Sequence, residues 1–172
     1  SVFRSAPDTW AIDQLFPVLP LQRLEERPTT LASLADLTCD SDGRLNRFIG
    51  EGQVKPLLEL HPLSGNDTYL IGLFLSGAYQ EVMGNLHNLF GTTNAVHIRL
   101  SPGGSYRIDH VVKGDTNADV LEAMEHDPRA LLERLRVAAE AAISSGQLRI
   151  DESQKLLEHL ERSLRQTTYL QL

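Results

Sequence analysis

The sequence is poor in cysteine and has no long apolar run. Its single cysteine, Cys39, excludes an internal disulfide and favours a reducing compartment, so we expect a cytoplasmic location. The longest apolar stretch, residues 69–75 (YLIGLFL), is strand-sized and well below the roughly 18 residues that a membrane helix needs. No charged-then-apolar leader precedes residue 10, and we therefore expect no signal peptide.

Positive charge is also scarce. Sixteen Lys and Arg against 23 Asp and Glu give a net charge of -7, and the basic residues are scattered. A nucleic-acid partner is therefore not expected, because counterion release needs clustered cations. The six histidines are not spaced as zinc ligands, so no metal site is predicted from spacing. With 41% hydrophobic and 23% charged residues, the composition is that of an ordinary globular protein with no membrane partner.

The first two thirds of the chain read as short strands. Four prolines between residues 7 and 28 bias their neighbours toward extended or turn structure, and residues 8–16 have room for one helical turn. Residues 69–75 are predicted to form a buried strand, and residues 82–90 a helix that Gly91 ends. The other expected strands are residues 31–38, 48–49, 54–60, and a hairpin of 95–100 with 105–112 around 101–104 (SPGG).

From residue 114 onward, the sequence pattern predicts helices. A first helix is expected from a cap at Asp115 or Thr116 through residue 124, and a second from Asp127 to about residue 144. Asp151, with a glutamine three residues later, predicts the capping box of a last helix through residue 164. We therefore predict an α+β fold with a mostly β region, residues 1–113, and a helical C-terminal appendage, residues 114–172.

Two segments contain side chains that could take part in binding or catalysis. Cys39 and Asp40 follow a predicted strand, where a thiol could deliver a proton and a carboxylate could bind a cationic group. From spacing alone, a buried cysteine before a solvated Asp-Gly turn is the favoured interpretation. Gly77 and Tyr79 join a predicted strand to a predicted helix, a natural place for a phosphate. A tight connection with a packed Tyr79 is an equally good interpretation.

Several long motifs, in order, resemble one family. They are residues 8–17 (DTWAIDQLFP), 37–43 (LTCDSDG), 77–81 (GAYQE), 86–96 (LHNLFGTTNAV) and the ending 168–170 (TYL). Together they resemble the C-terminal region of biosynthetic arginine decarboxylases, enzymes that use pyridoxal 5'-phosphate (PLP). The resemblance implies an alanine racemase-like C-terminal β-barrel, expected here to be incomplete. It also implies an N-terminal (β/α)8 barrel domain of the same protein, and an active site where two subunits of a homo-oligomer, a dimer or higher, meet.

By the same resemblance, Cys39 is the catalytic residue that protonates the substrate carbon after CO2 leaves. Asp40 binds the cationic end of the substrate, and Asp8 is a second substrate-binding carboxylate. Tyr79, with Gly77, contacts the cofactor phosphate. A guanidinium group fits such carboxylates because charge-assisted, bidentate pairs are strong and directional. Magnesium dependence is implied as well, with no ligand cluster evident in the sequence.

The expected function is thus the conversion of arginine to agmatine and CO2 for putrescine and spermidine biosynthesis, with PLP as cofactor. The family's cofactor lysine belongs to the N-terminal domain, and no lysine here, at positions 55, 113 and 155, lies in a similar motif. We therefore expect this chain alone to be inactive. The alternative is a non-catalytic, decarboxylase-like binding or regulatory module, although such a module has no need of both Cys39 and Asp40.

Overall fold

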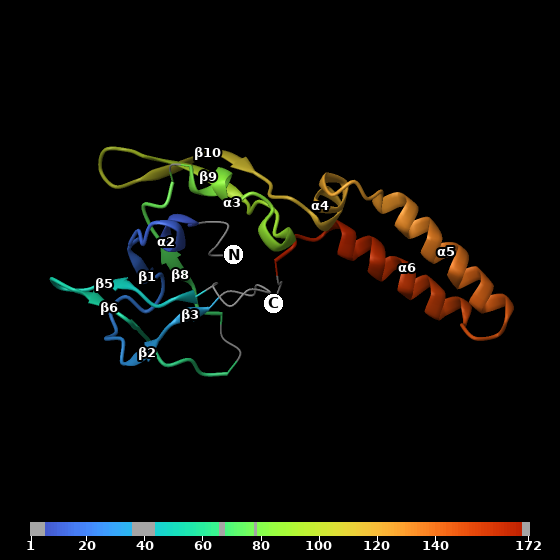
Figure 1. Ribbon diagram of the computed structural model, residues 1–172, viewed down its shortest axis with the longest axis horizontal. Helices are drawn as coiled ribbons and strands as arrows, with labels where there is room; N and C mark the ends of the chain where they lie inside the picture. Colours follow the sequence, from blue (N-terminus) through green and yellow to red (C-terminus); the bar gives the residue numbers. More distant parts are fainter. Residues whose placement is uncertain (1–5, 36–43, 66–67, 78, 170–172) are drawn as a thin grey trace. The chain divides into compact units, whose positions relative to one another are not determined.

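The computed structural model describes residues 6–35, 44–65, 68–77 and 79–169 and divides into two compact units, Ser1–Asn88 and Leu89–Leu172. The first unit contains short strands and two short helices, and the second a hairpin and three helices (Figure 1). The predicted α+β class is confirmed. The helical appendage expected from residue 114 lies inside the second unit, and the boundary at residue 113 stays a prediction.

Antiparallel pairs of short strands build the first unit. β1 pairs with β8, β2 with β7, β3 with β4, and β5 with β6. The described residues form two-stranded ladders and no closed barrel, so the barrel stays a prediction. The bounds are Val18–Pro20 (β1), Thr30–Ala32 (β2), Leu34–Ala35 (β3), Arg44–Leu45 (β4), Phe48–Ile49 (β5), Val54–Lys55 (β6), Leu58–Leu60 (β7) and Ile71–Leu73 (β8).

One apolar cluster forms the core of this unit. Phe48 is its most buried side chain, with 2% of its surface exposed. Leu58 and Leu60 point into the cluster while Glu59 between them faces solvent, the period of two that strands impose. The buried members are Val18, Leu45, Phe48, Leu58 and Leu60, drawn from β1, β4, β5 and β7. Burial of this cluster from four ladders is what holds the short strands together.

Two predictions for this unit are wrong in extent. The stretch 69–75 forms only β8, whose residues are half-buried, and Leu75 is 86% exposed. Among the described residues, β8 pairs with one strand, β1, and is not flanked by strands on both sides. The helix expected over residues 82–90 is α3 (Gln80–Gly84), followed by a short 3-10 turn, η1 (His87–Leu89). Asn85 has φ 47°, outside the right-handed helical region, and this ends α3.

The remaining strand predictions differ in smaller ways. The one helical turn expected within residues 8–16 is confirmed as α2 (Asp8–Ala11). The stretch 54–60 is divided into β6 and β7 around Pro56, which cannot donate to a ladder. The described part of the stretch 31–38 is divided between β2 and β3.

In the second unit, β9 (Ala95–Leu100) and β10 (Tyr106–Val112) form the expected hairpin. Cross-strand pairs alternate between an apolar face and a polar face, with Ile98 opposite Ile108 and His97 opposite His110. The register shifts between Ile108 and His110, which leaves Asp109 as an extra residue on β10. Asp109 forms ion pairs with Arg99 and Arg107 on either strand.

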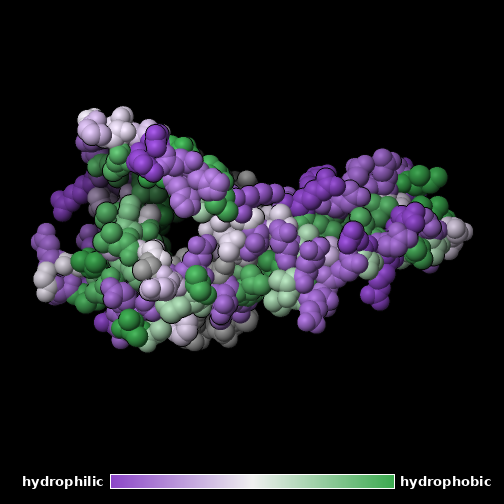
Figure 2. Space-filling view, turned by 90° about the horizontal axis from the view of Figure 1, so that it is seen from above, coloured by the Kyte–Doolittle hydropathy of each residue, from purple (hydrophilic) through white to green (hydrophobic). Residues whose placement is uncertain are grey.

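Three helices complete this unit: α4 (Asn117–Ala123), α5 (Pro128–Ser144) and α6 (Ile150–Arg165). Thr116 caps α4 and Asp127 caps α5, both as predicted. For α6 the predicted capping box is wrong: the helix begins at Ile150, and Glu152 accepts a hydrogen bond from the backbone N–H of Arg149 at 2.9 Å. α5 and α6 run antiparallel, side by side (Figure 1), with green apolar patches among their purple polar surface (Figure 2).

The end of α6 is tied back to the segment before β9. The Tyr169 hydroxyl donates to the Gly91 carbonyl at 2.9 Å, and the Gly91 N–H donates to the Thr168 hydroxyl at 2.9 Å. The Tyr169 ring stacks on Phe90 with centroids 5.2 Å apart. These contacts fix the base of the helical hairpin.

Candidate functional site

Asp8 opens helix α2 at a fixed backbone position. Its carbonyl accepts hydrogen bonds from the N–H groups of Ile12 and Gln14, and the preceding Ala6 and Pro7 are buried. The Asp8 side chain is half-buried, and its Oδ2 accepts from Gln80 Nε2 at 2.6 Å. The structure therefore joins this predicted site residue to the beginning of α3, 72 positions along the chain.

Gly77 and Tyr79 lie just before α3, in the same unit as Asp8. A Cβ built at Gly77 would meet nothing within 4 Å, so the backbone there is open to a ligand. Tyr79 is 77% exposed and adopts φ 66° and ψ -12°, a left-handed conformation that is costly for a residue other than glycine. The predicted phosphate-contacting residues are thus accessible, and Tyr79 is held in a strained backbone.

Gln80 is the residue that the sequence did not single out. Its side chain is only 5% exposed, and it pairs with both the backbone and the carboxylate of Asp8. It lies inside the motif 77–81, but no spacing or composition signal distinguishes it from the exposed residues beside it. The structure brings Asp8, Gln80 and the adjacent Tyr79 together.

Cys39 and Asp40 lie outside the described residues. The residues described before and after this stretch of the chain are β3 and β4, which pair antiparallel with Ala35 opposite Arg44. The roles of the thiol and its neighbouring carboxylate therefore stay predictions.

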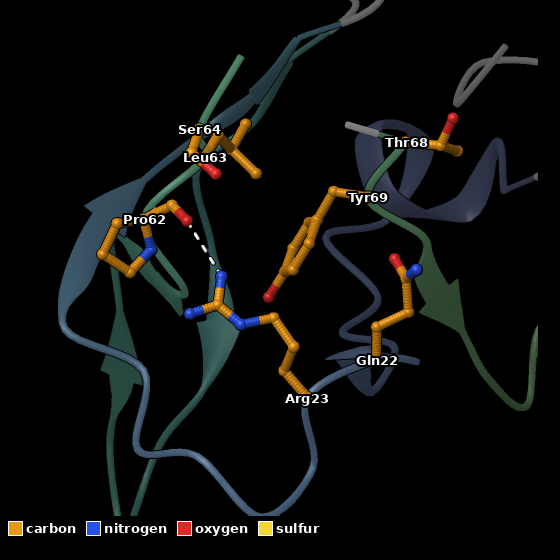
Figure 3. Close-up of a pocket in the computed structure, with 7 residues that line it drawn as sticks. All are labelled: Gln22, Arg23, Pro62, Leu63, Ser64, Thr68 and Tyr69. Carbon is orange, nitrogen blue, oxygen red and sulfur yellow. Dashed lines mark hydrogen bonds between the residues drawn. The ribbon is translucent and has the colours of Figure 1, made fainter. Parts of the chain in front are cut away.

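A hollow of about 320 Å³ lies elsewhere in the first unit (Figure 3). Arg23 there forms an ion pair with Glu26, which raises the pKa of Arg23 and lowers that of Glu26 through their hydrogen bond. Arg23 also donates to the Pro62 carbonyl at 2.9 Å, so its charge and donors are already engaged. The lining residues are Gln22, Arg23, Pro62, Leu63, Ser64, Thr68 and Tyr69. This hollow contains none of the predicted site residues.

Buried beside that hollow, His61 is structural. Its Nε2 lies 2.9 Å from the Glu26 carbonyl, which can only accept, so Nε2 carries the proton. Nδ1 then accepts from the Tyr69 hydroxyl, whose oxygen in turn accepts from the His61 backbone N–H at 3.2 Å. These hydrogen bonds hold the segment before β8 against the end of β7. They use both ring nitrogens of His61, so its role is structural.

A second hollow of about 320 Å³ lies at the junction of α4 and α5. It is lined by Leu121, Glu125, His126, Asp127, Ala130, Leu131 and Arg134. Within the part of the chain that the structure describes, no three His, Cys, Asp or Glu side chains are grouped to hold a metal ion. No helix over those same residues is long and apolar enough to cross a membrane.

Comparison with known proteins gives a consistent result. Residues 118–170 match the family described as the arginine decarboxylase C-terminal helical extension. The biosynthetic arginine decarboxylase of Parasynechococcus marenigrum (strain WH8102) is 85% identical, over 99% of this chain and 27% of that protein. That of Synechococcus sp. (strain RCC307) is 72% identical, over 99% of this chain and 27% of that protein.

A solved structure agrees. The crystal structure of the biosynthetic arginine decarboxylase from Campylobacter jejuni matches with a TM-score of 0.82 and 35% identity, over 99% of this chain and 28% of that one. The chain spans about a quarter of the length of the curated relatives it matches. These matches define its class as the C-terminal region of an amino-acid decarboxylase with a helical extension. The chain belongs to the biosynthetic arginine decarboxylase family, and it corresponds to the C-terminal part of that enzyme.

Proposed function

We propose that the full-length protein is a PLP-dependent lyase that converts arginine to agmatine and CO2 for putrescine and spermidine biosynthesis in the cytoplasm. The observation that carries this is the match of 99% of the chain, at 85% identity, to a biosynthetic arginine decarboxylase. This chain contributes the C-terminal part of each subunit of a homo-oligomer. Its first unit completes the predicted β-barrel together with the rest of the enzyme.

The proposed site residues divide the work of binding and proton transfer. Asp40 and Asp8 present carboxylates to the substrate guanidinium, because opposite charges at hydrogen-bond distance give strong and directional contacts. Cys39 holds the proton that the substrate carbon receives once CO2 has left. A thiol is suited to this task because its S–H bond can deliver a proton to a neighbouring atom.

The residues before α3 fit a phosphate group. Space at Gly77 lets a ligand approach the backbone, and the exposed Tyr79 offers a hydroxyl donor. When bound, PLP supplies an electron sink for the pair left by the broken C–C bond, and the protein supplies orientation and protons. The lysine that attaches the cofactor is assigned by the resemblance to the N-terminal domain. Among the described residues, no three His, Cys, Asp or Glu side chains are grouped as ligands for magnesium.

Arginine-dependent CO2 release by the full-length enzyme with PLP tests this function. The wild-type enzyme is expected to be active, and Cys39→Ala is expected to lose about 100-fold or more in kcat, since general acids typically contribute this much. Lys155→Ala on the exposed face of α6 is the matched control and should keep full activity. The chain of residues 1–172 alone should release no CO2.

Two results would count against the proposal. No CO2 release from the folded, PLP-supplied full-length protein would favour a binding or regulatory module instead. Unchanged turnover in Cys39→Ala would leave the family in place and remove the role proposed for the thiol.

A further inference from the structure

A buried glutamine side chain is bound to a candidate substrate-binding carboxylate. Gln80 is the first residue of α3, and only 5% of its surface is exposed. Burying a polar amide is costly unless hydrogen bonds compensate. Part of this compensation comes from Asp8 of α2, which forms two hydrogen bonds with the Gln80 side chain, at 2.6 Å and 3.1 Å.

The Gln80 amide donates one of the two hydrogen bonds and accepts the other, and this fixes the orientation of the amide. Gln80 Nε2 donates to Asp8 Oδ2, and Gln80 Oε1 accepts from the Asp8 backbone N–H. An ionised carboxylate can only accept and a backbone N–H can only donate, so just one orientation of the amide satisfies both. The amide thus grips the backbone and the carboxylate of Asp8 at once, which restricts rotation of the carboxylate.

Both residues of this pair lie in hydrogen-bonded backbone. On the α2 side, the Asp8 carbonyl accepts from two N–H groups of the following turn, and Ala6 and Pro7 are buried. On the α3 side, Gln80 directly follows Tyr79, whose left-handed backbone persists only where neighbours determine it. The Tyr79 carbonyl accepts the first helical hydrogen bond, from the Met83 N–H at 2.9 Å.

We propose that Gln80 is a positioning residue that holds the Asp8 carboxylate in its substrate-binding orientation through this two-point hydrogen bond. The inference rests on the proposed function, in which Asp8 binds the guanidinium group of arginine. A carboxylate held in advance loses less rotational freedom on binding, so Gln80 improves substrate binding without touching the substrate. Asp8 touches the substrate, and Gln80 acts only through Asp8.

The test is a double-mutant cycle in the full-length enzyme, measured as kcat and KM for arginine with saturating PLP. Gln80→Met keeps the length of the side chain and removes both hydrogen bonds. It is expected to raise KM about tenfold with kcat changed less than threefold, the pattern of lost uniform binding. Gln53→Met, the same substitution at an exposed glutamine, is the matched control and should leave both constants unchanged.

The second arm removes the carboxylate. Asp8→Asn should raise KM by at least as much as Gln80→Met does. Adding Gln80→Met to Asp8→Asn should then raise KM by less than twofold, because residues that act through one contact are not additive. If the two effects multiply instead, Gln80 contributes through the general fold and the proposal is overturned.

A further variant guards against a folding failure. Gln80→Glu keeps the acceptor for the Asp8 N–H but places a second carboxylate against Oδ2, so KM should rise at least as much as in Gln80→Met. A normal KM in both folded variants overturns the positioning role. If only Asp8→Asn has a normal KM, the substrate-binding role proposed for Asp8 is wrong. If the wild-type enzyme releases no CO2, the proposed function itself is wrong.

Discussion

The buried ring of Phe48 supports a quantitative prediction about the core of the first unit. Phe48 and Ile49 are neighbours on β5, but the Phe48 side chain is 2% exposed and the Ile49 side chain 51% exposed. Phe48 packs in the cluster shared with Val18, Leu45 and Leu58. Replacing a buried Phe by Ala removes its apolar contacts and leaves a cavity, at a cost of about 3–5 kcal/mol.

The measurement is hydrogen exchange of the full-length enzyme, followed in peptides that cover residues 44–61. Amides in the core exchange through local opening, and each 1.4 kcal/mol of lost stability speeds that exchange about tenfold. Phe48→Ala should therefore lower protection roughly 100-fold or more in these peptides. Ile49→Ala, the control on the same strand, should lower it less than about tenfold, because an exposed side chain contributes little.

Equal losses of protection in the two variants would refute this reasoning. They would mean that burial at Phe48 is not what holds the β5–β6 ladder to the rest of the unit. Phe48→Leu, which keeps most of the apolar volume, should fall between the wild type and Phe48→Ala.

Three further predictions concern the second unit. Asp127→Ala should cost α5 about 1 kcal/mol in stability through loss of its N-cap, seen as a lower melting temperature. Gly114→Ala should cost about 1–3 kcal/mol by the same measurement, since the new Cβ would clash with the Thr92 carbonyl oxygen. Hydrogen bonds from the Thr116 hydroxyl and N–H lower the pKa of Asp119 below its ordinary 3.8, so its stabilisation is present above that value and disappears as pH falls through the folded pKa. The melting temperatures of wild type and Asp119→Asn should therefore differ at pH 7 and converge on acidification.

Controls for the first two of these predictions are available in the same chain. Asp127→Asn keeps an acceptor for the helix N-terminus and should retain most of the cap. Gly77→Ala, at an open position of the first unit, should leave the melting temperature unchanged, because nothing lies within 4 Å of the Cβ it adds. A melting-temperature gap for Asp119→Asn that widened below pH 4 would contradict the sign of the pKa shift.

Only some of the candidate site residues could be predicted from the sequence. The motif order identified the family and named Cys39, Asp40, Asp8, Tyr79 and Gly77, and the comparisons confirm the family while leaving those roles as predictions. Gln80 was missed because a glutamine has no characteristic spacing and its partner lies 72 residues away.

Local signals in the sequence determined the helical region and the hairpin. An Asp-Pro pair starts α5 where it was expected, and a turn of Ser, Pro and Gly closes β9 onto β10, because caps and tight turns act within four residues. Only the tertiary structure decided how far β8 and α3 extend and which side chains are buried. It also joined Asp8 to Gln80. These features depend on partners distant in the chain, since burial and long-range hydrogen bonds belong to neighbours in space, which a local pattern does not encode.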